Sequence, residues 1–188
     1  MSNVISWSSI ELLHNVVRTL NHLASLPPSE GGRPLGRVLY KAKVKLHGTN
    51  CAVQVLRGSD GSLCDPITQS RTTILTPQDD LHGFSKWVNA RGLGNSAGDH
   101  WSYFACLQPG IVVFGEWCGP GVESGMAVSG LPEKQFCVFG ILDGGKLVYE
   151  PGDVVAYLNG SAGYIPKNMH VLPWMPFEVE VDFSSQES

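Results

Sequence analysis

The period of the apolar positions along the chain predicts a helix followed by strands. Within residues 8–26, apolar side chains recur at helical spacing, at Ile10, Leu13, Val17, Leu20 and either Leu23 or Ala24. Ser8 or Ser9 can cap this helix, and a Pro-Pro pair ends it. Residues 1–34 are therefore predicted to form an N-terminal helix and loop.

From residue 38 onward the pattern changes to period two, which is typical of strands. Lys41, Lys43 and Lys45 alternate with apolar residues. We expect a strand that ends at Lys45 and carries the three lysines on one face. Gly48 breaks the pattern, and a second, apolar strand is expected over residues 51–56.

Short strands and helices alternate over the rest of the chain. Strands are expected at residues 67–72, 111–116, 135–142 and 147–149, with a hairpin turn at 143–146. Helices are expected at residues 79–91, 101–107 and 151–158, with a glycine-rich loop at 92–98. A few helices among many antiparallel strands predict an α+β fold.

Composition supports a folded domain that is rich in turns. The 188 residues are 43% hydrophobic with a mean hydropathy near zero, enough for one packed domain over residues 1–188. The 22 glycines and 12 prolines exceed an average share and favour short strands over a helical bundle. A net charge of −4 excludes a globally basic nucleic-acid coat, while a local basic cleft stays open. The polar tail, residues 184–188, is expected to fray.

Targeting segments and metal motifs do not stand out in the sequence. The sequence contains no run of about 18 apolar residues, so no transmembrane helix is predicted. Residues 1–7 lack the basic and apolar blocks of a secretory signal. The five cysteines include no Cys-x-x-Cys pair, so neither a disulfide framework nor a zinc site is expected. These features favour reduced thiols in an intracellular protein without membrane contact.

The segment Lys45–Asn50, Lys-Leu-His-Gly-Thr-Asn, carries the clearest candidate chemistry. A lysine beside a tight turn can reach a bound phosphate, and it becomes a nucleophile once its amine is neutral. At an ordinary pKa of about 10.4 only ~0.04% of the amine is neutral at pH 7, and cationic neighbours raise that share. Lys41 and Lys43 are such neighbours if the strand alternation holds. Exposed strand lysines before a turn are the plainer alternative.

Four motifs, taken in order, resemble those of one enzyme family. Lys45–Asn50 resembles the nucleophile motif of covalent nucleotidyltransferases, in the form found in the RNA ligase 2-like branch of ATP-dependent polynucleotide ligases. Gln69–Thr72 resembles the second motif, an arginine after a strand. Phe114–Val122, with Phe-Gly-Glu before a Gly-Pro-Gly turn, resembles the third, and Phe136–Ile141 resembles the aromatic strand that follows. One such motif is weak evidence, but four in the family's order are specific.

The resemblance implies a ligase-type nucleotidyltransferase fold, with antiparallel sheets around a nucleotide cleft and a few flanking helices. In the implied reaction Lys45 attacks the α-phosphate of ATP, with Mg²⁺ as cofactor, and becomes lysyl-AMP. The AMP then passes to the 5′-phosphate end of an RNA, which is joined to a 3′-hydroxyl end.

The resemblance also assigns nucleotide contacts. Arg71 is expected to contact phosphate through its planar guanidinium group. Glu116 is expected to accept hydrogen bonds from the ribose hydroxyls, and Phe139 to stack on adenine. The plainer interpretations are an exposed arginine, a solubility charge and a core phenylalanine. Because Phe136 and Phe139 are three residues apart on one strand, we expect them on opposite faces, one in the core and one toward the ligand.

Four further residues have less specific expected roles. His47 and Asn50 are expected to position the turn or the reacting groups. Lys41 and Lys43 are expected to contact phosphates or RNA. No residue is assigned as a metal ligand, because magnesium in such a site keeps few protein ligands of its own.

The chain departs from the family at three places. Val44 stands where relatives often carry an acid before the nucleophile, and Gly140 where an acid often follows the stacking phenylalanine. The later motifs Glu-Gly-Val-Val and Lys-x-Lys are absent from residues 141–188. We therefore expect the front part of a longer ligase, truncated before its last motifs. A non-catalytic nucleotide- or RNA-binding relative, a DNA ligase and a GTP-using capping-type enzyme stay open as alternatives.

Overall fold

The contacts of the chain group it into two units, where the sequence predicted one domain over residues 1–188. The larger unit comprises Met1–Trp7 and Lys45–Pro173, and the smaller unit comprises Ser8–Val44 and Trp174–Ser188. The structure is a computed structural model that describes residues 3–7, 13–32, 36–62, 64–90, 103–160 and 163–182. The glycine-rich loop and the polar tail expected from the sequence lie outside these residues.

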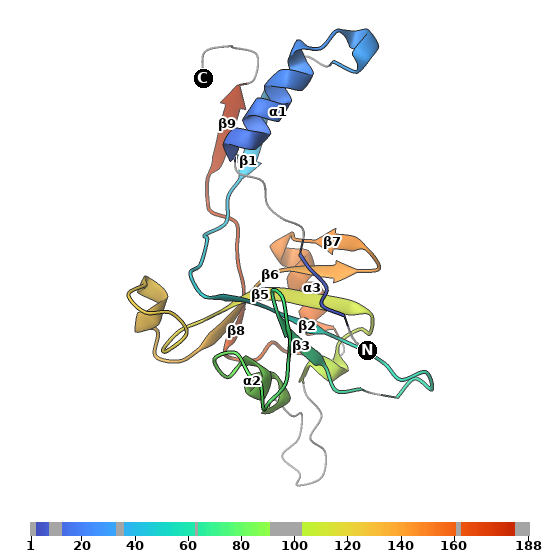
Figure 1. Cartoon of the computed structure of the whole chain (residues 1–188), viewed down its shortest axis with the longest axis vertical. Helices are drawn as coiled ribbons and strands as arrows, with labels where there is room; N and C mark the ends of the chain where they lie inside the picture. Colours follow the sequence, from blue (N-terminus) through green and yellow to red (C-terminus); the bar gives the residue numbers. More distant parts are fainter. Residues whose placement is uncertain are drawn as a thin grey trace. The chain divides into compact units, whose positions relative to one another are not determined.

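A seven-stranded sheet forms the centre of the larger unit (Figure 1). Its strands are β2 (Thr49–Gln54), β3 (Ile67–Ser70), β4 (Ile74–Leu75), β5 (Ile111–Cys118), β6 (Gln135–Asp143), β7 (Lys146–Val148) and β8 (Met169–Val171). The order is β4-β3-β2-β5-β6-β7, all antiparallel, and β8 adds a parallel pairing to β6. The predicted α+β fold is confirmed, while the short strands β4 and β8 were not predicted.

Two α-helices pack with the sheet on its core side. They are α2 (Phe84–Ala90) and α3 (Pro151–Asn159). Short 3₁₀ turns are formed by Tyr103–Cys106 and by Ala127–Gly130. The predicted start of α2 at residue 79 is wrong, because the Asp80 carboxylate instead accepts the backbone N–H groups of Ser85 and Lys86, at 2.7 and 3.1 Å. An acidic side chain before a helix satisfies N–H groups that have no partner within the helix.

The two faces of this sheet carry different side chains. The core face holds the large apolar cluster, including Val53, Trp117 and Phe136. The opposite face, called the second face here, carries a smaller cluster around Ala52, Val112 and Phe114, with Phe139 packed against it. Phe136 and Phe139 therefore lie on opposite faces, as the sequence predicted.

A bulge at Phe139 places Gly140 on the second face beside it. Along the β5–β6 ladder Phe114 pairs with Gly140 but Gly115 pairs with Val138, so Phe139 is an extra residue without an opposite partner. Such bulges bend a strand and redirect its side chains. Phe139 and Gly140 consequently both lie on the second face, and the alternation resumes with Ile141 in the core.

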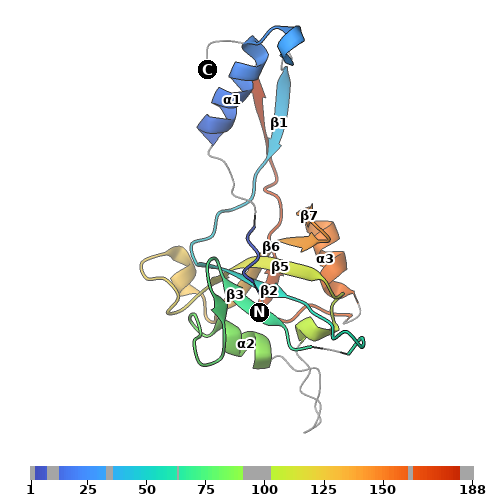
Figure 2. The same ribbon diagram turned by 45° about the vertical axis from the view of Figure 1, so that its right-hand side comes forward.

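The N-terminal segment, residues 3–7, lies on the second face (Figure 2). The Gln69 side chain holds it at both backbone groups of Ile5, accepting from its N–H at 3.1 Å and donating to its carbonyl at 2.7 Å. Gln54 donates to the carbonyl of Asn3 at 2.9 Å and to Gln69 at 2.7 Å. These bonds place the Trp7 indole against the rings of Phe114 and Phe139.

The smaller unit pairs β1 (Arg37–Lys41) with β9 (Glu178–Asp182), and α1 (Leu13–Ser25) lies beside this ladder (Figures 1 and 2). The sequence placed a helix over residues 8–26, of which 8–12 lie outside the described part. Strand β9 was not predicted, although its alternating Glu and Val residues have the strand period.

The predicted strand ending at Lys45 is wrong. Strand β1 ends at Lys41, and no regular structure follows until β2 begins at Thr49. The strand ends there because its pairing with β9 ends at Lys41, which is opposite Glu178. One further backbone hydrogen bond follows, from the Met175 N–H to the Ala42 carbonyl at 2.7 Å. Lys41 and Lys43 lie in the smaller unit and Lys45 in the larger, so they do not share a strand face.

The other predicted strands and the helix over residues 151–158 are confirmed with small shifts of their ends, whereas the helix predicted over residues 101–107 is a short 3₁₀ turn at Tyr103–Cys106 in the part of it that the structure describes. The β6–β7 hairpin turns at Gly144 and Gly145, both at positive φ, as the Asp-Gly-Gly-Lys sequence indicated. Pro151 opens α3, and Asp153 lies in its first turn. None of the described helices has both the length and the apolar character that crossing a membrane requires.

Candidate functional site

The strand register brings several of the predicted site residues to one end of the sheet. Asn50 at the start of β2 pairs with Glu116 near the end of β5, and Cys51 pairs with Ser70, the last residue of β3. Because neighbouring strands run antiparallel, the start of β2 meets the ends of β3 and β5 and the start of β6. Segments far apart in the sequence therefore converge there.

A hydrogen bond joins the nucleophile-like segment to β5. The backbone N–H of Gly48 donates to Glu116 Oε1 at 3.1 Å. A side chain at position 48 has no room, because its Cβ would lie 2.4 Å from the Trp117 carbonyl oxygen and 2.8 Å from the Cys118 Cβ. Glycine at this position therefore allows the turn after Lys45 to lie directly on β5.

Glu116 is half-buried and lies beside the turn at Gly48. Burial raises the pKa of Glu116 above its ordinary value. The Gly48 hydrogen bond and the nearby basic side chains of Lys45 and His47 act in the opposite direction, and Glu123 adds to the rise. The net effect is a raised pKa for the Glu116 carboxyl group.

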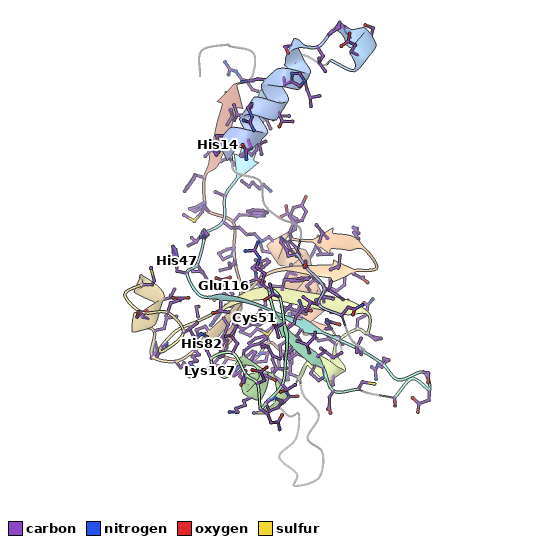
Figure 3. All side chains as sticks on the ribbon, viewed as in Figure 1. His14, His47, Cys51, His82, Glu116 and Lys167 are labelled. Carbon is purple, nitrogen blue, oxygen red and sulfur yellow. The ribbon has the colours of Figure 1, made fainter. Side chains whose placement is uncertain are left out.

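Lys45 and His47 are exposed on either side of Leu46, whereas Asn50 is half-buried in β2. Figure 3 labels His47 and Glu116 near one another, close to the start of β2. The Gly48 hydrogen bond holds the segment that carries Lys45 and His47 beside Glu116, and Asn50 is opposite Glu116 in the ladder. The structure thus brings together Lys45, His47, Asn50 and Glu116.

Arg71 lies at the same end of the sheet, one strand further along. It is exposed in the tight turn between β3 and β4, directly after Ser70, as the second motif led us to expect. The Ser70 hydroxyl accepts the backbone N–H of Thr73 at 3.0 Å and so shapes this turn. The register that pairs Cys51 with Ser70 places the turn next to the start of β2.

Phe139 lies on the same face as Glu116, but its ring is already in contact with another aromatic. The ring centroids of Trp7 and Phe139 are 5.3 Å apart, with the rings edge to face. The ring centroids of Trp7 and Phe114 are 5.2 Å apart. A Cβ on Gly140 would lie 2.2 Å from the Trp7 indole. The glycine that departs from the family pattern is therefore the residue that leaves room for Trp7.

Lys41 and Lys43 have a different environment from Lys45. Their ammonium groups lie over the indole of Trp174, 5.8 and 4.5 Å from the ring centroid. Such cation–π contacts hold the two lysines against the aromatic ring. Both lysines and Trp174 belong to the smaller unit.

Comparisons with known proteins identify the family. A family model described as RNA ligase matches residues 40–181, which is most of the chain. The chain belongs to the RNA ligase family. No curated protein matches the sequence.

The structure is also similar to that of a Naegleria gruberi RNA ligase with PPi, with a TM-score of 0.54 and 16% sequence identity. The match covers 96% of this chain and 44% of that chain. At this identity the likeness concerns the fold, and this RNA ligase family member spans less than half of the Naegleria gruberi chain.

The site of this RNA ligase family member also contains residues that sequence reasoning missed. Trp7 lies near the start of the chain and Phe139 lies in β6, so no local pattern links the two rings. Gln69 was noted only as part of the second motif, and its hydrogen bonds to Ile5 were not predicted. Among the described residues, no cluster of three or more His, Cys, Asp or Glu side chains could hold a metal ion.

Proposed function

We propose that this chain is the adenylyltransferase part of an ATP-dependent RNA ligase that seals 5′-phosphate and 3′-hydroxyl ends. The observation that carries the proposal is the Gly48–Glu116 hydrogen bond, which joins the Lys45 turn to the Phe-Gly-Glu strand in a member of the RNA ligase family. The RNA ligase 2-like form of the Lys45 motif supports ATP and RNA as substrates.

Lys45 is proposed to be the catalytic nucleophile. Its neutral Nζ attacks the α-phosphorus of ATP, so that an N–P bond forms while the bond to the β-phosphate oxygen breaks. Pyrophosphate leaves, and the proton of the amine passes to solvent. The exposed position of Lys45 gives a nucleotide access to Nζ, and the Gly48 bond fixes the turn from which it extends.

Glu116 and Asn50 are proposed to hold the ribose. A carboxylate has two oxygens and about four acceptor sites, so Glu116 can accept ribose hydroxyls as well as the Gly48 N–H. Asn50 pairs with Glu116 in the ladder and offers an amide on the same face. His47 is proposed to position the turn, and Arg71 to contact a phosphate group through its fork of N–H donors.

Phe139 is proposed to stack on the adenine ring. Its position on the second face, with Glu116 and Asn50, supports a base on that face. Lys41 and Lys43 are proposed to contact phosphates or RNA, which the cation–π contact with Trp174 would compete with.

Mg²⁺ fits this site as an ion held mainly by phosphate oxygens and water, because the described residues offer no cage of carboxylates. When bound, it would offset phosphate charge. Lys45, Arg71 and Glu116 would do the remaining work of attack and orientation.

The test is covalent labelling with α-labelled ATP and Mg²⁺. We expect weak labelling through an acid-labile, base-stable bond, and we expect Lys45→Ala to abolish it. Lys146→Ala is the matched control, because Lys146 is an exposed lysine on the β7 hairpin and should label as the parent does. Undiminished labelling of the Lys45→Ala variant would show that Lys45 is not the nucleophile.

The open alternatives give different results in the same assay. A non-catalytic relative binds nucleotide or RNA without labelling at any time point. A capping-type enzyme takes label from GTP instead of ATP. A DNA ligase labels with ATP but passes the AMP to nicked DNA and not to nicked RNA.

A further inference from the structure

Two cysteines lie side by side on the second face of the sheet. The Sγ atoms of Cys118 on β5 and Cys137 on β6 are 3.9 Å apart. In the ladder Glu116 is opposite Cys137 and Gln135 is opposite Cys118, so the two cysteines are diagonal neighbours. All five cysteines of the chain are thiols in the structure.

This pair adjoins the candidate site on both of its sides. The Cys118 Cβ lies under the Gly48 turn, so close that a Cβ on Gly48 would be 2.8 Å from it. Cys137 lies directly across the ladder from Glu116. The two residues joined by the Gly48–Glu116 hydrogen bond are thus each adjacent to one cysteine of the pair.

The two thiols differ in acidity. The hydrogen bond between them lowers the pKa of Cys118 and raises that of Cys137, which burial raises further. The thiolate is the reactive form of cysteine, so Cys118 is the better nucleophile of the pair. Cys137 is then the resolving thiol at contact distance.

We propose that Cys118 and Cys137 form a reversible dithiol–disulfide switch that hydrogen peroxide closes and that impairs the adjacent site. The consequence for the site rests on the proposed function, whereas the disulfide itself does not. Peroxide is the oxidant because it is small and both thiols are buried, at 1% and 8% exposure.

The chemistry balances with peroxide alone. The Cys118 thiolate attacks one oxygen, the O–O bond breaks, and the departing hydroxide takes up a proton to leave as water. The Cys137 sulfur then attacks the resulting sulfenic acid, forms the S–S bond and releases a second water. Two thiols and one peroxide give one disulfide and two waters, and a thiol reductant reverses the step by exchange.

Closure requires the sulfurs to approach from 3.9 Å to the roughly 2.05 Å of a disulfide. Because diagonal neighbours typically lie about 7–8 Å apart, at the upper limit of what a disulfide bridges, the backbones of β5 and β6 must also move toward each other near Gly48 and Glu116. The hydrogen bond that joins the Lys45 turn to Glu116 then loses its present geometry. A misplaced nucleophile of this kind lowers the rate of transfer.

The first experiment detects the bond without any activity. The reduced 188-residue chain is treated with hydrogen peroxide, and mass spectrometry of the intact protein and its peptides follows. We expect loss of two hydrogen atoms and a cross-linked pair of peptides containing Cys118 and Cys137, both reversed by dithiothreitol. Cys118→Ser and Cys137→Ser should each lose the cross-link, and Cys64→Ser, a cysteine away from the pair, should keep it.

The second experiment measures the consequence. We expect peroxide to lower the initial rate of ATP labelling on the order of tenfold in the parent and in Cys64→Ser, with recovery after reduction. Cys118→Ala and Cys137→Ala should keep their rate under peroxide. Thermal melts of each variant show that a lost response is not a lost fold.

The outcomes separate the two proposals. A cross-link between other cysteines, or none at all in folded protein, overturns the switch. A Cys118–Cys137 cross-link that leaves the labelling rate unchanged overturns its effect on the site. A cross-link in a chain that labels neither before nor after oxidation leaves the disulfide standing and contradicts the proposed ligase function instead.

Discussion

At Gly140 the absence of a side chain decides how the second face of the sheet packs. A Cβ there would lie 2.2 Å from the Trp7 indole, so Gly140→Ala forces the two apart. Overpacking of this kind costs about 1–3 kcal/mol of the free energy of unfolding, which urea denaturation measures. Gly130→Ala is the control, because nothing lies within 4 Å of its added Cβ.

The same prediction distinguishes a local clash from a general backbone effect. In the double variant Trp7→Leu with Gly140→Ala, the clash is gone, so the loss should be smaller than the sum of the two single losses. Additive losses would mean that Trp7 is not what fills the space beside Gly140.

Glu116 gives a prediction about pH. Burial raises its pKa, so the folded state holds the proton more tightly than the unfolded chain does. The free energy of unfolding should therefore fall as the pH rises from about 4 through the raised pKa, and Glu116→Gln should flatten this fall. Urea unfolding over a pH series measures it. An unchanged pH profile in Glu116→Gln would contradict the raised pKa.

Glu116→Gln also separates stability from activity. The neutral amide removes the cost of burying a charge, so the variant should be at least as stable as the parent near neutral pH. It should nevertheless label more slowly with ATP, because an amide accepts hydrogen bonds less strongly than a carboxylate. A variant that is unstable and inactive together would indicate a structural role alone.

Among the elements, the N-terminal segment depends on one buried side chain. Gln69 holds both backbone groups of Ile5 and also accepts from Gln54. In Gln69→Leu these groups lose their partner, which should cost about 1–3 kcal/mol. Hydrogen exchange should also speed up at residues 3–7, more than elsewhere in the sheet. Gln78→Leu, at an exposed loop position, should change neither quantity.

The elements that the sequence predicted well are those whose signal is local. The apolar run of β5, the Asp-Gly-Gly turn before β7 and the Pro151 start of α3 each have their cause within a few residues. The alternation from Lys41 to Lys45 has the strand period too, yet the strand stops at Lys41. A strand needs a partner, and the partner β9 lies at the other end of the chain.

The candidate site shows the same division. The residues Lys45, Glu116 and Arg71 could be proposed from motifs, because each stands beside a turn or strand end that the sequence marks. The contact between Trp7 and Phe139 and the adjacency of Cys118 and Cys137 depend on strand register and on a bulge at Phe139. A single sequence does not specify either.

For the whole molecule, the distribution of positive charge predicts weak activity. The chain has 13 lysines and arginines against 17 acids, and the Lys-x-Lys motif of the family is absent from residues 141–188. The negative charge of the triphosphate would be balanced mainly by Lys45 and Arg71, together with Lys41 and Lys43. The loss of charged contacts to a transferring phosphoryl group typically lowers the rate by about two to four orders of magnitude.

We therefore expect this chain to fold, to label slowly with ATP and to leave nicked RNA unjoined. Single-turnover labelling measures the first rate, and a gel assay with 5′-phosphate and 3′-hydroxyl ends measures joining. The labelling rate should fall further as salt is raised, because few charges hold the triphosphate and ions screen them. Joining at rates on the order of 1 s⁻¹, an ordinary value for enzymes, would contradict this expectation. Residues between Ile141 and Asp182 would then have to supply the charges that the absent motif supplies in the family.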